Sequence, residues 1–209
     1  MKKGDRKMKT KWNVKEMALI GMLGTVAALL MLIRTPLPFM PPFMDFDLAA
    51  LPEIIGGFAL GPVAAIFIII VKLIVKLAML GTSTAFTGEL SNFILSCSYM
   101  LPAIWIYNYH KSKHSAMIGM IVGTFVCAIM AVITNVFMII PFYAHMFGWT
   151  IQDVVDMCHA VAPFVNNTVT LALFGIIPFN LIKNGVASFI TYIVYKKLSV
   201  PLKRFASKN

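Results

Sequence analysis

The sequence predicts an all-α membrane protein with six transmembrane helices, and three observations support this fold class. Apolar residues make up 59% of the 209 residues, charged residues only 12%, and the mean hydropathy is +0.84. The apolar residues form runs that are long enough to cross a bilayer. Of the 18 Lys and Arg residues, seven lie within the first fifteen residues and five follow Tyr195. Basic clusters beside apolar spans mark the cytoplasmic side of a membrane protein, so the net charge of +10 indicates orientation rather than nucleic-acid binding.

The chain divides into three parts on this pattern. We expect residues 1–15 to form a basic cytoplasmic arm, residues 16–198 a six-helix transmembrane domain, and residues 199–209 a basic cytoplasmic tail. A cleaved signal peptide is not expected at the N-terminus. The first apolar run is followed by Arg34-Thr-Pro and not by the small residues of a cleavage site.

The first predicted helix covers residues 17–33, which suffice to span a bilayer at a rise of about 1.5 Å per residue. Small residues spaced four apart lie along it, namely Gly21, Gly24, Thr25 and Ala28. Such a strip permits the close approach of another helix. That helix belongs either to a partner subunit or to the same bundle, and the sequence leaves both possibilities open.

Residues 34–47 contain four prolines and cannot form a regular helix. We expect a stiff, aromatic-rich connection that is long enough to cover a site. Residues 48–60 are too short for a normal span and end at Gly61-Pro62, a strong turn signal, so the second helix is predicted to be short or broken.

The third helix is predicted over residues 63–80, with Lys72 and Lys76 on one face. A turn at Gly61-Pro62 would fold it against the second helix and bring the two lysines to the depths of Glu53 and Asp47. The sequence therefore predicts ion pairs between Glu53 and Lys72 and between Asp47 and Lys76. The alternative is that the lysines extend separately to a membrane surface.

The second half of the chain supplies three further helices. A polar loop at residues 81–88 precedes a fourth helix that begins at Glu89, which either complements the helix dipole or faces a cavity. The fifth helix is predicted over residues 116–140, with Asn135 in its outer half, and is followed by a long loop at residues 141–162. The sixth, over residues 163–195, is expected to kink at Pro178.

The charges of the loops orient these six spans. Six spans place both termini on one side, and the basic ends select the cytoplasm. Lys111 and Lys113 fall in a cytoplasmic loop, whereas the loops predicted to be external contain only Arg34 among basic residues. The polar residues of the later helices then lie in the outer half of the membrane, which predicts a pocket near the external surface.

Asn180, Lys183 and Asn184 lie in the middle of the last apolar segment. A lysine near the centre of a span costs about 2.5–3.5 kcal/mol on insertion scales, so it should face a cavity, an opposite charge or a ligand. Asn180 and Lys183 are three residues apart and share one helix face. We interpret these residues as half of a binding site.

The sequence lacks the motifs of several enzyme classes. It contains no G-x-x-x-x-G-K-[ST] phosphate loop, no H-E-x-x-H and no G-x-S-x-G. Binding or transport therefore remains, and no catalytic or metal-ligating residue is assigned. The 12% aromatic residues and 15 methionines suit a flat apolar ligand held by adaptable walls.

Nearly the whole chain resembles the substrate-binding S components of energy-coupling-factor (ECF) vitamin transporters, specifically the riboflavin-binding type. The resemblance rests on the Pro-rich residues 37–47, on Leu-Pro-Glu-Ile-Ile-Gly-Gly-Phe-Ala-Leu-Gly-Pro at 51–62, on Thr-Gly-Glu-Leu-Ser-Asn-Phe at 87–93, on Leu-Pro-Ala at 101–103, on Asn135 with Pro141, and on Asn-Leu-Ile-Lys-Asn at 180–184. Glu53 and Lys72 depart from it by adding charge.

The resemblance implies a subunit that captures riboflavin outside a bacterial plasma membrane and docks on a transmembrane coupling subunit driven by two ATPases. Riboflavin would be the transported ligand and not a cofactor, and FMN or flavin analogues are further candidate ligands. The residues implied as substrate contacts, including those of a gate in the Pro-rich loop, are Glu89, Asn135, Asn180, Lys183, Asn184, Phe39, Met40, Phe43, Asp45 and Phe46. Gly21, Gly24, Thr25 and Ala28 are the candidate docking strip.

Three alternatives stay open at this stage. The chain could be an S component for another vitamin, a stand-alone small-molecule carrier, or a membrane-embedded enzyme that uses Lys183 and Glu89 as acid and base. Riboflavin also fits independently of the resemblance. One edge of its isoalloxazine ring presents carbonyls and ring nitrogens, which amide side chains and an ammonium group can match.

Overall fold

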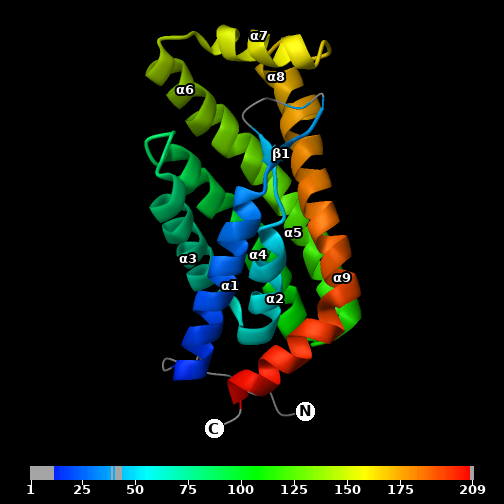
Figure 1. Cartoon of the computed structure of the whole chain (residues 1–209). Helices are drawn as coiled ribbons and strands as arrows, with labels where there is room; N and C mark the ends of the chain where they lie inside the picture. Colours follow the sequence, from blue (N-terminus) through cyan, green and yellow to red (C-terminus); the bar gives the residue numbers. More distant parts are fainter. Residues whose placement is uncertain (1–11, 39, 41–43, 208–209) are drawn as a thin grey trace.

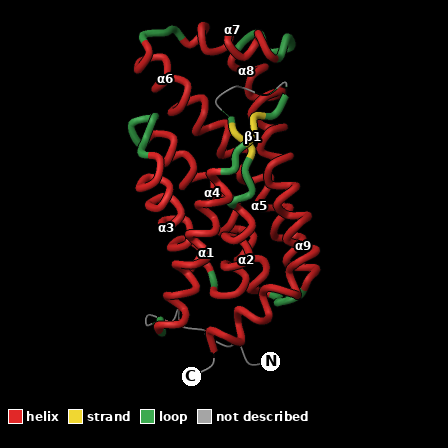
Figure 2. Tube along the Cα trace, viewed as in Figure 1, coloured by secondary structure: helices red, strands yellow, loops and turns green. Residues whose placement is uncertain are grey.

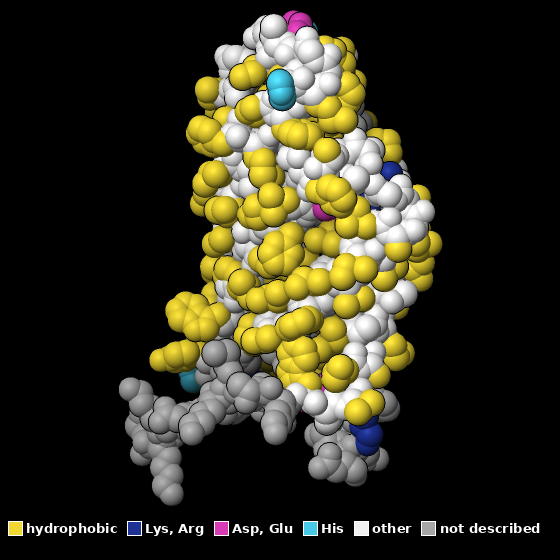
Figure 3. All heavy atoms as spheres, turned by 90° about the vertical axis from the view of Figure 1, so that its left-hand side faces the viewer, with side chains coloured by type: hydrophobic (Ala, Val, Ile, Leu, Met, Phe, Trp, Pro, Cys, Tyr) yellow, Lys and Arg dark blue, Asp and Glu magenta, His cyan; other side chains and the backbone are white. Residues whose placement is uncertain are grey.

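The computed structural model describes residues 12–38, 40 and 44–207 and forms a bundle of helices that run along the length of the molecule (Figure 1). Five helical segments are long and apolar enough to cross a membrane: Val14–Leu32, Pro62–Leu80, Thr87–Tyr109, Lys113–Phe147 and Thr168–Tyr195. Apolar side chains cover most of the face in Figure 3, where charged side chains are few. The prediction of an all-α membrane protein is confirmed at this level.

Helix α1 (Val14–Leu32) starts at a capping box, in which the Asn13 side chain accepts from the Glu16 backbone N–H and the Glu16 carboxylate accepts in return. After it, the chain forms a two-stranded antiparallel ladder of β1 (Thr35–Pro36) and β2 (Asp45–Phe46). The Pro-rich segment is thus non-helical, as predicted. The short strands were not predicted, and they anchor both ends of the segment beside α9 (Figure 1).

Helix α2 (Ala50–Leu60) is short, as predicted, and lies in the middle of the bundle against α1, α3, α4 and α9. Two glycines permit this central position. A Cβ atom at Gly56 would lie 2.4 Å from Ile68 Cδ1, and one at Gly57 would lie 2.3 Å from Ile104 Cδ1. Gly61, with a φ of 102°, turns the chain into α3 (Pro62–Leu80).

Helix α4 (Thr87–Tyr109) packs against α5 (Lys113–Thr134). The expected loop after residue 140 is wrong. A π-helical stretch, η1 (Asn135–Ile139), leads directly into α6 (Ile140–Phe147), and a separate helix α7 (Ile151–Val161) follows. Figure 1 shows α7 lying across the end of the bundle opposite the termini, and Figure 2 shows how little of this region is loop.

The π-helical stretch explains why Pro141 does not end the helix. A proline inside a helix lacks an N–H donor and clashes with the carbonyl four residues earlier, whereas a π-turn inserts one residue and changes that pairing. The same arrangement recurs at Pro178. Helix α8 (Thr168–Leu171) passes through a second π-helical stretch, η2 (Ala172–Ile176), into α9 (Ile177–Ser207). The last helix therefore continues as far as Ser207, within the predicted basic tail.

Candidate binding site

A cavity of about 330 Å³ lies among the last turns of α1 and α3, the start of α4, η1, the middle of α9, the β1–β2 ladder and the first turn of α2. Its volume falls within the range of small-molecule sites. Six of the ten residues proposed from the sequence as ligand contacts line it: Asp45, Glu89, Asn135, Asn180, Lys183 and Asn184. Residues that are 139 positions apart in the chain thus converge on one space, which supports the interpretation of α9 as half of a site.

The α9 wall of the cavity carries Asn180, Lys183 and Asn184. Asn180 donates from Nδ2 to the Ile176 carbonyl oxygen at 2.9 Å. This side chain therefore supplies a hydrogen-bond donor to the backbone at the end of the π-helical stretch η2. Lys183 Nζ lies 2.7 Å from Asp47 Oδ2. The ammonium group therefore has an opposite charge within the protein, which meets one of the three requirements set by its position in a span.

Another part of the cavity wall includes Asn135, the first residue of η1. Its Nδ2 donates to the Ala131 carbonyl oxygen at 2.8 Å, the same four-residue contact that Asn180 makes on α9. Both asparagines are buried, with 6% and 5% of their surface exposed. Each keeps a second amide N–H for a ligand, because a carboxamide carries two N–H donors. π-Helical stretches occur frequently at functional sites. Among the described residues there are two, and each involves a cavity-lining asparagine: Asn135 begins η1, and Asn180 donates to Ile176 at the end of η2.

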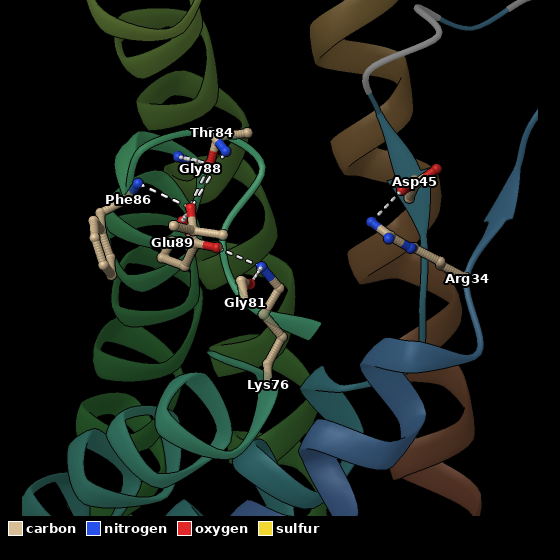
Figure 4. Close-up of polar contacts among 9 residues, drawn as sticks. Arg34, Asp45, Lys76, Gly81, Thr84, Phe86, Gly88 and Glu89 are labelled. Carbon is tan, nitrogen blue, oxygen red and sulfur yellow. Dashed lines mark hydrogen bonds and ion pairs between the residues drawn. The ribbon is translucent and has the colours of Figure 1, made fainter. Parts of the chain in front are cut away.

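Glu89 lies at the start of α4 and lines the cavity, so both predicted roles, at the helix start and in the cavity, apply to it. One of its oxygens contacts Lys76, and the other accepts from the Thr82 and Thr84 hydroxyls, each at 3.1 Å (Figure 4). The predicted pair of Asp47 with Lys76 is wrong. The Lys76 ammonium group donates to the Gly81 carbonyl oxygen and contacts Glu89. The Asp47 carboxylate pairs instead with Lys183 on α9.

The predicted ion pair between Glu53 and Lys72 is confirmed, with 2.5 Å between Glu53 Oε1 and Lys72 Nζ. Both side chains are 1% exposed. Lys72 also donates to Asn92 Oδ1 at 2.6 Å and to Ser96 Oγ at 3.1 Å. All four of these side chains line the cavity.

The remaining contacts predicted in the Pro-rich segment divide into two groups. Asp45 lines the cavity and pairs with Arg34 at 3.0 Å (Figure 4), whereas Met40 and Phe46 pack against an apolar cluster formed by α6, α7 and the α8–α9 region and do not line it. Phe39 and Phe43 lie outside the described residues. Met44 lines the cavity and was missed, because an apolar residue among other apolar residues carries no distinguishing signal.

The family model "ECF transporter, substrate-specific component" matches residues 15–195. The chain belongs to this family. It is 34% identical over 202 residues to the riboflavin transporter RibU of Staphylococcus aureus, covering 96% of this chain and 98% of that one. It is 27% identical to the riboflavin transporter FmnP of Bacillus subtilis, covering 89% and 93%.

A solved structure described as the S component of a bacterial ECF transporter is also similar to this substrate-specific component. The two align with a TM-score of 0.71 at 30% identity, covering 91% of this chain and 98% of the other. The family consists of transporter components, so the expectation of transport rather than enzyme chemistry is confirmed, as is that of a multi-pass bacterial membrane protein.

The proposed docking strip of this substrate-specific component is only half available. Ala28 is fully buried, and a Cβ atom at Gly24 would lie 2.6 Å from Val71 Cβ, so these two residues pack against α3 of the same chain. Gly24 and Ala28 therefore fit the other alternative left open by the sequence, in which the strip packs within the same bundle. Gly21 has nothing within 4 Å of an added Cβ, and Thr25 is exposed with its hydroxyl bonded to the Gly21 carbonyl.

Arg34 and four further charged residues of the cavity were not assigned to the site from the sequence, the four being Asp47, Glu53, Lys72 and Lys76. All four were recognised as charges near spans but were assigned to ion pairs alone. The signal that could have placed them is the cost of a charge at membrane depth, the same argument that identified Lys183. Each forms an ion pair between two helices, or between a helix and a loop, so these residues also fix the shape of the cavity.

Proposed function

We propose that this substrate-specific component binds riboflavin in the cavity described above and delivers it to a coupling subunit. The observation that carries the proposal is the convergence of Asn135, Asn180 and Asn184 from two walls on one largely buried cavity. Carboxamides both donate and accept, which suits the alternating carbonyls and ring nitrogens of an isoalloxazine edge. The names of the relatives, riboflavin transporters RibU and FmnP, support the same ligand.

The charges of the cavity favour a neutral ligand. Its lining contains four acidic and four basic side chains, and these form four ion pairs: Arg34–Asp45, Lys183–Asp47, Lys72–Glu53 and Lys76–Glu89. Among the described residues of the lining, no cation is left over for a phosphate, which is best bound by unpaired Arg or Lys. Riboflavin is uncharged, so we expect it to bind more tightly than FMN.

The proposed orientation places both termini in the cytoplasm through six spans, of which α2 is the short one. The cavity then opens toward the external side, and the Pro-rich segment between β1 and β2 acts as its gate. The basic termini and the acidic side chains of α7 support this orientation through the positive-inside rule. The contact of Lys183 with Asp47, just after β2, would couple the gate to α9.

The proposed partners are a transmembrane coupling subunit and two ATPases. The sequence has no phosphate-binding loop of its own, which supports a need for external ATP hydrolysis. The exposed half of the α1 strip, Gly21 and Thr25, is the part that remains available for helix docking.

Flavin binding and reconstitution test this proposal. The purified chain should be yellow or should quench added riboflavin fluorescence, and FMN should compete more weakly. In liposomes it should bind riboflavin but accumulate it only after coupling and ATPase subunits are added. Failure to bind riboflavin while binding another vitamin would assign a different substrate, and concentrative uptake by this chain alone would reject the partner proposal.

A further inference from the structure

Helix α7 presents three different sides, although its 11 residues are too few to span a membrane. One side is buried in the apolar cluster at the end of the bundle and consists of Val154, Val155 and Cys158. A second side is exposed and polar, with Gln152 hydrogen-bonded to Asp156. The third side is exposed and apolar, because Met157 and Val161, four residues apart, are 39% and 41% exposed. Such a helix is amphipathic toward its surroundings as well as toward the bundle.

Exposed aromatic side chains flank α7 at both ends. Before the helix, the rings of Phe147 and Trp149 stack with 4.9 Å between their centroids and are 49% and 41% exposed. After it, Phe164 and Phe174 make an edge contact at 5.8 Å and are 45% and 50% exposed. Tryptophan is enriched where a membrane meets water, because its amphipathic ring suits the level of the headgroups. Trp149 therefore indicates that the start of α7 lies at that level.

The exposed apolar surface beside α7 is continuous with that of the preceding span. Between Lys113 and Asp153 the sequence contains no Asp, Glu, Lys or Arg. Large apolar residues are exposed along this stretch, among them Ile121, Phe125, Ile129, Ile133, Phe137 and Met146. Figure 3 shows apolar side chains reaching the end of the molecule at which α7 lies in Figure 1. The apolar side of α7 thus adjoins a surface that lipid covers.

The length of the segment before α7 brings this helix to the depth of the lipid headgroups. Lys113–Phe147 contains 35 residues, which extend about 50 Å at the rise of a helix. The hydrocarbon core of a bilayer is about 30 Å thick, and the headgroup regions bring the total to about 40–45 Å. A segment that begins at one surface and tilts as spans usually do therefore ends in or just beyond the opposite headgroup region. At that depth an amphipathic helix can lie flat on the membrane.

The charges define the kind of contact that α7 makes with the bilayer. The sequence contains no Lys or Arg between Lys113 and Lys183, whereas α7 carries Asp153 and Asp156. Anionic headgroups attract Lys and Arg, so electrostatic attraction does not hold this helix on the membrane. Burial of apolar and aromatic side chains is the contact that remains.

We propose that α7 is an interfacial helix. Met157, Val161 and the preceding Trp149 lie among the headgroups and upper acyl chains of the leaflet opposite the termini, while Asp153 and Asp156 face water. The inference goes beyond the proposed function and does not depend on it, since no ligand takes part. It has a consequence for the cavity, because the buried side of α7 shares an apolar cluster with the Pro-rich segment. Lipid contact on one side of α7 therefore supports the end of that segment on the other.

Quenching of tryptophan fluorescence in phosphatidylcholine vesicles tests this position. The chain has three tryptophans, so a full-length chain with Trp12→Phe and Trp105→Phe reports Trp149 alone. We expect lipid brominated near the headgroup end of its acyl chains to quench this emission strongly. Lipid brominated near the chain ends and aqueous acrylamide should quench it less. No flavin is added, so the result is independent of ligand binding.

Two substitutions compare the exposed sides of α7. Each is placed in a chain in which Trp149→Phe is added to the other two replacements, so that one tryptophan remains. Met157→Trp, on the apolar side, should be quenched by the brominated lipid as Trp149 is. Gln152→Trp, the matched control on the polar side, should be quenched mainly by acrylamide. Adding anionic phosphatidylglycerol to the vesicles should not increase the lipid quenching at either position, because α7 carries no Lys or Arg.

Three results would overturn the proposal. Quenching of Trp149 and of Met157→Trp by acrylamide but not by brominated lipid would place α7 in water. Protection from both quenchers would mean that protein, such as a second copy of the chain, covers the apolar side. Lipid quenching that requires anionic lipid, or that is equal for Met157→Trp and Gln152→Trp, would contradict the assignment of the two sides. Each variant is first checked for a single elution peak in detergent, and if Met157→Trp does not fold, the native Trp149 still decides.

Discussion

Asp47 and Lys183 join the segment after β2 to α9 by an ion pair of 2.7 Å that is largely buried, with the two side chains 7% and 18% exposed. The second carboxylate oxygen of Asp47 accepts from the Ala49 backbone N–H at 2.9 Å, just before α2. One carboxylate therefore fixes the end of the Pro-rich segment, the start of the short helix and the cavity wall. Lys183 was expected from the sequence to bind ligand, and the structure gives it a structural partner as well.

Replacing Lys183 by Met should therefore lower stability before any ligand is added. The change leaves Asp47 buried with only the Ala49 N–H, at a cost of about 1–3 kcal/mol. Thermal unfolding of the purified protein in detergent measures the effect. Arg34→Met is the matched control, because the Arg34–Asp45 pair is exposed and contributes about 0–1 kcal/mol. Equal melting temperatures for the two variants would show that the Asp47 pair has no structural role.

The Glu53–Lys72 pair should show strong coupling in a double-mutant cycle. Either single replacement, Glu53→Leu or Lys72→Met, leaves an uncompensated buried charge and should cost up to about 3–5 kcal/mol. The double replacement removes both charges and should recover much of that loss, as apolar substitutes of similar volume do elsewhere. Thermal unfolding of the four proteins gives the coupling energy. Strictly additive losses would mean that the two side chains act independently in the folded protein.

Replacing Gly24 by a large side chain should destabilise the chain, whereas the same change at Gly21 should not. A Cβ at Gly24 meets Val71 Cβ and Cγ1 at 2.6 Å and the Ile68 carbonyl at 3.0 Å, so Gly24→Leu forces α1 away from α3 and should destabilise the chain by about 1–3 kcal/mol or more. Gly21→Leu meets open space and should fold normally, while weakening assembly if α1 docks a partner there. Melting temperature and co-purification with the coupling subunit provide the two measurements. A stable Gly24→Leu variant would contradict the packing described for α1.

Much of the fold could be predicted from the sequence, because a charged residue inside a membrane span is costly and therefore indicates an ion pair or a cavity. The apolar runs gave the spans, Gly61-Pro62 gave the α2–α3 turn, and the cost of Lys183 in a span located one wall of the cavity. Pairing by depth succeeded for Glu53 with Lys72. It failed for Asp47, because the position of α9 beside β2 depends on tertiary packing that no local pattern encodes.

The misassigned segments have an equally specific physical cause. Pro141 normally ends a helix, and only the preceding π-helical stretch at Asn135–Ile139 lets the helix continue to Phe147. Helix α7 was missed because its 11 residues are too few to span a membrane and include Asp153, Asp156 and His159, although Thr150 and Asp153 form a capping box at its start. The same signature, three residues apart, could have identified this helix.

The capping box gives α7 a predictable response to pH. Hydrogen bonds from the Thr150 backbone N–H and hydroxyl to the carboxylate hold the pKa of Asp153 below its usual value. This contribution to helix stability is complete above the unfolded pKa of about 3.9 and is lost as pH falls through the lower folded pKa. Hydrogen exchange of the α7 amides, corrected for intrinsic rates, should accelerate below about pH 4. Asp153→Asn should lose this step, whereas Asp156→Asn should keep it.

The orientation of the spans can be tested at two positions that lie at opposite ends of one helical segment. Lys111 precedes α5 and Asp153 follows α6, and the 35 residues of Lys113–Phe147 between them span about 50 Å at the rise of a helix. We expect a cysteine at position 153 to react with a membrane-impermeant maleimide in intact cells, and one at position 111 to react only after the membrane is opened. Both should be placed in a chain whose Cys97, Cys127 and Cys158 are replaced by Ser or Ala, with that chain alone as the background control. Because Asp153 is exposed on α7, failure to label it would not arise from burial. Labelling at 111 but not at 153 would invert the topology and place the cavity opening on the cytoplasmic side.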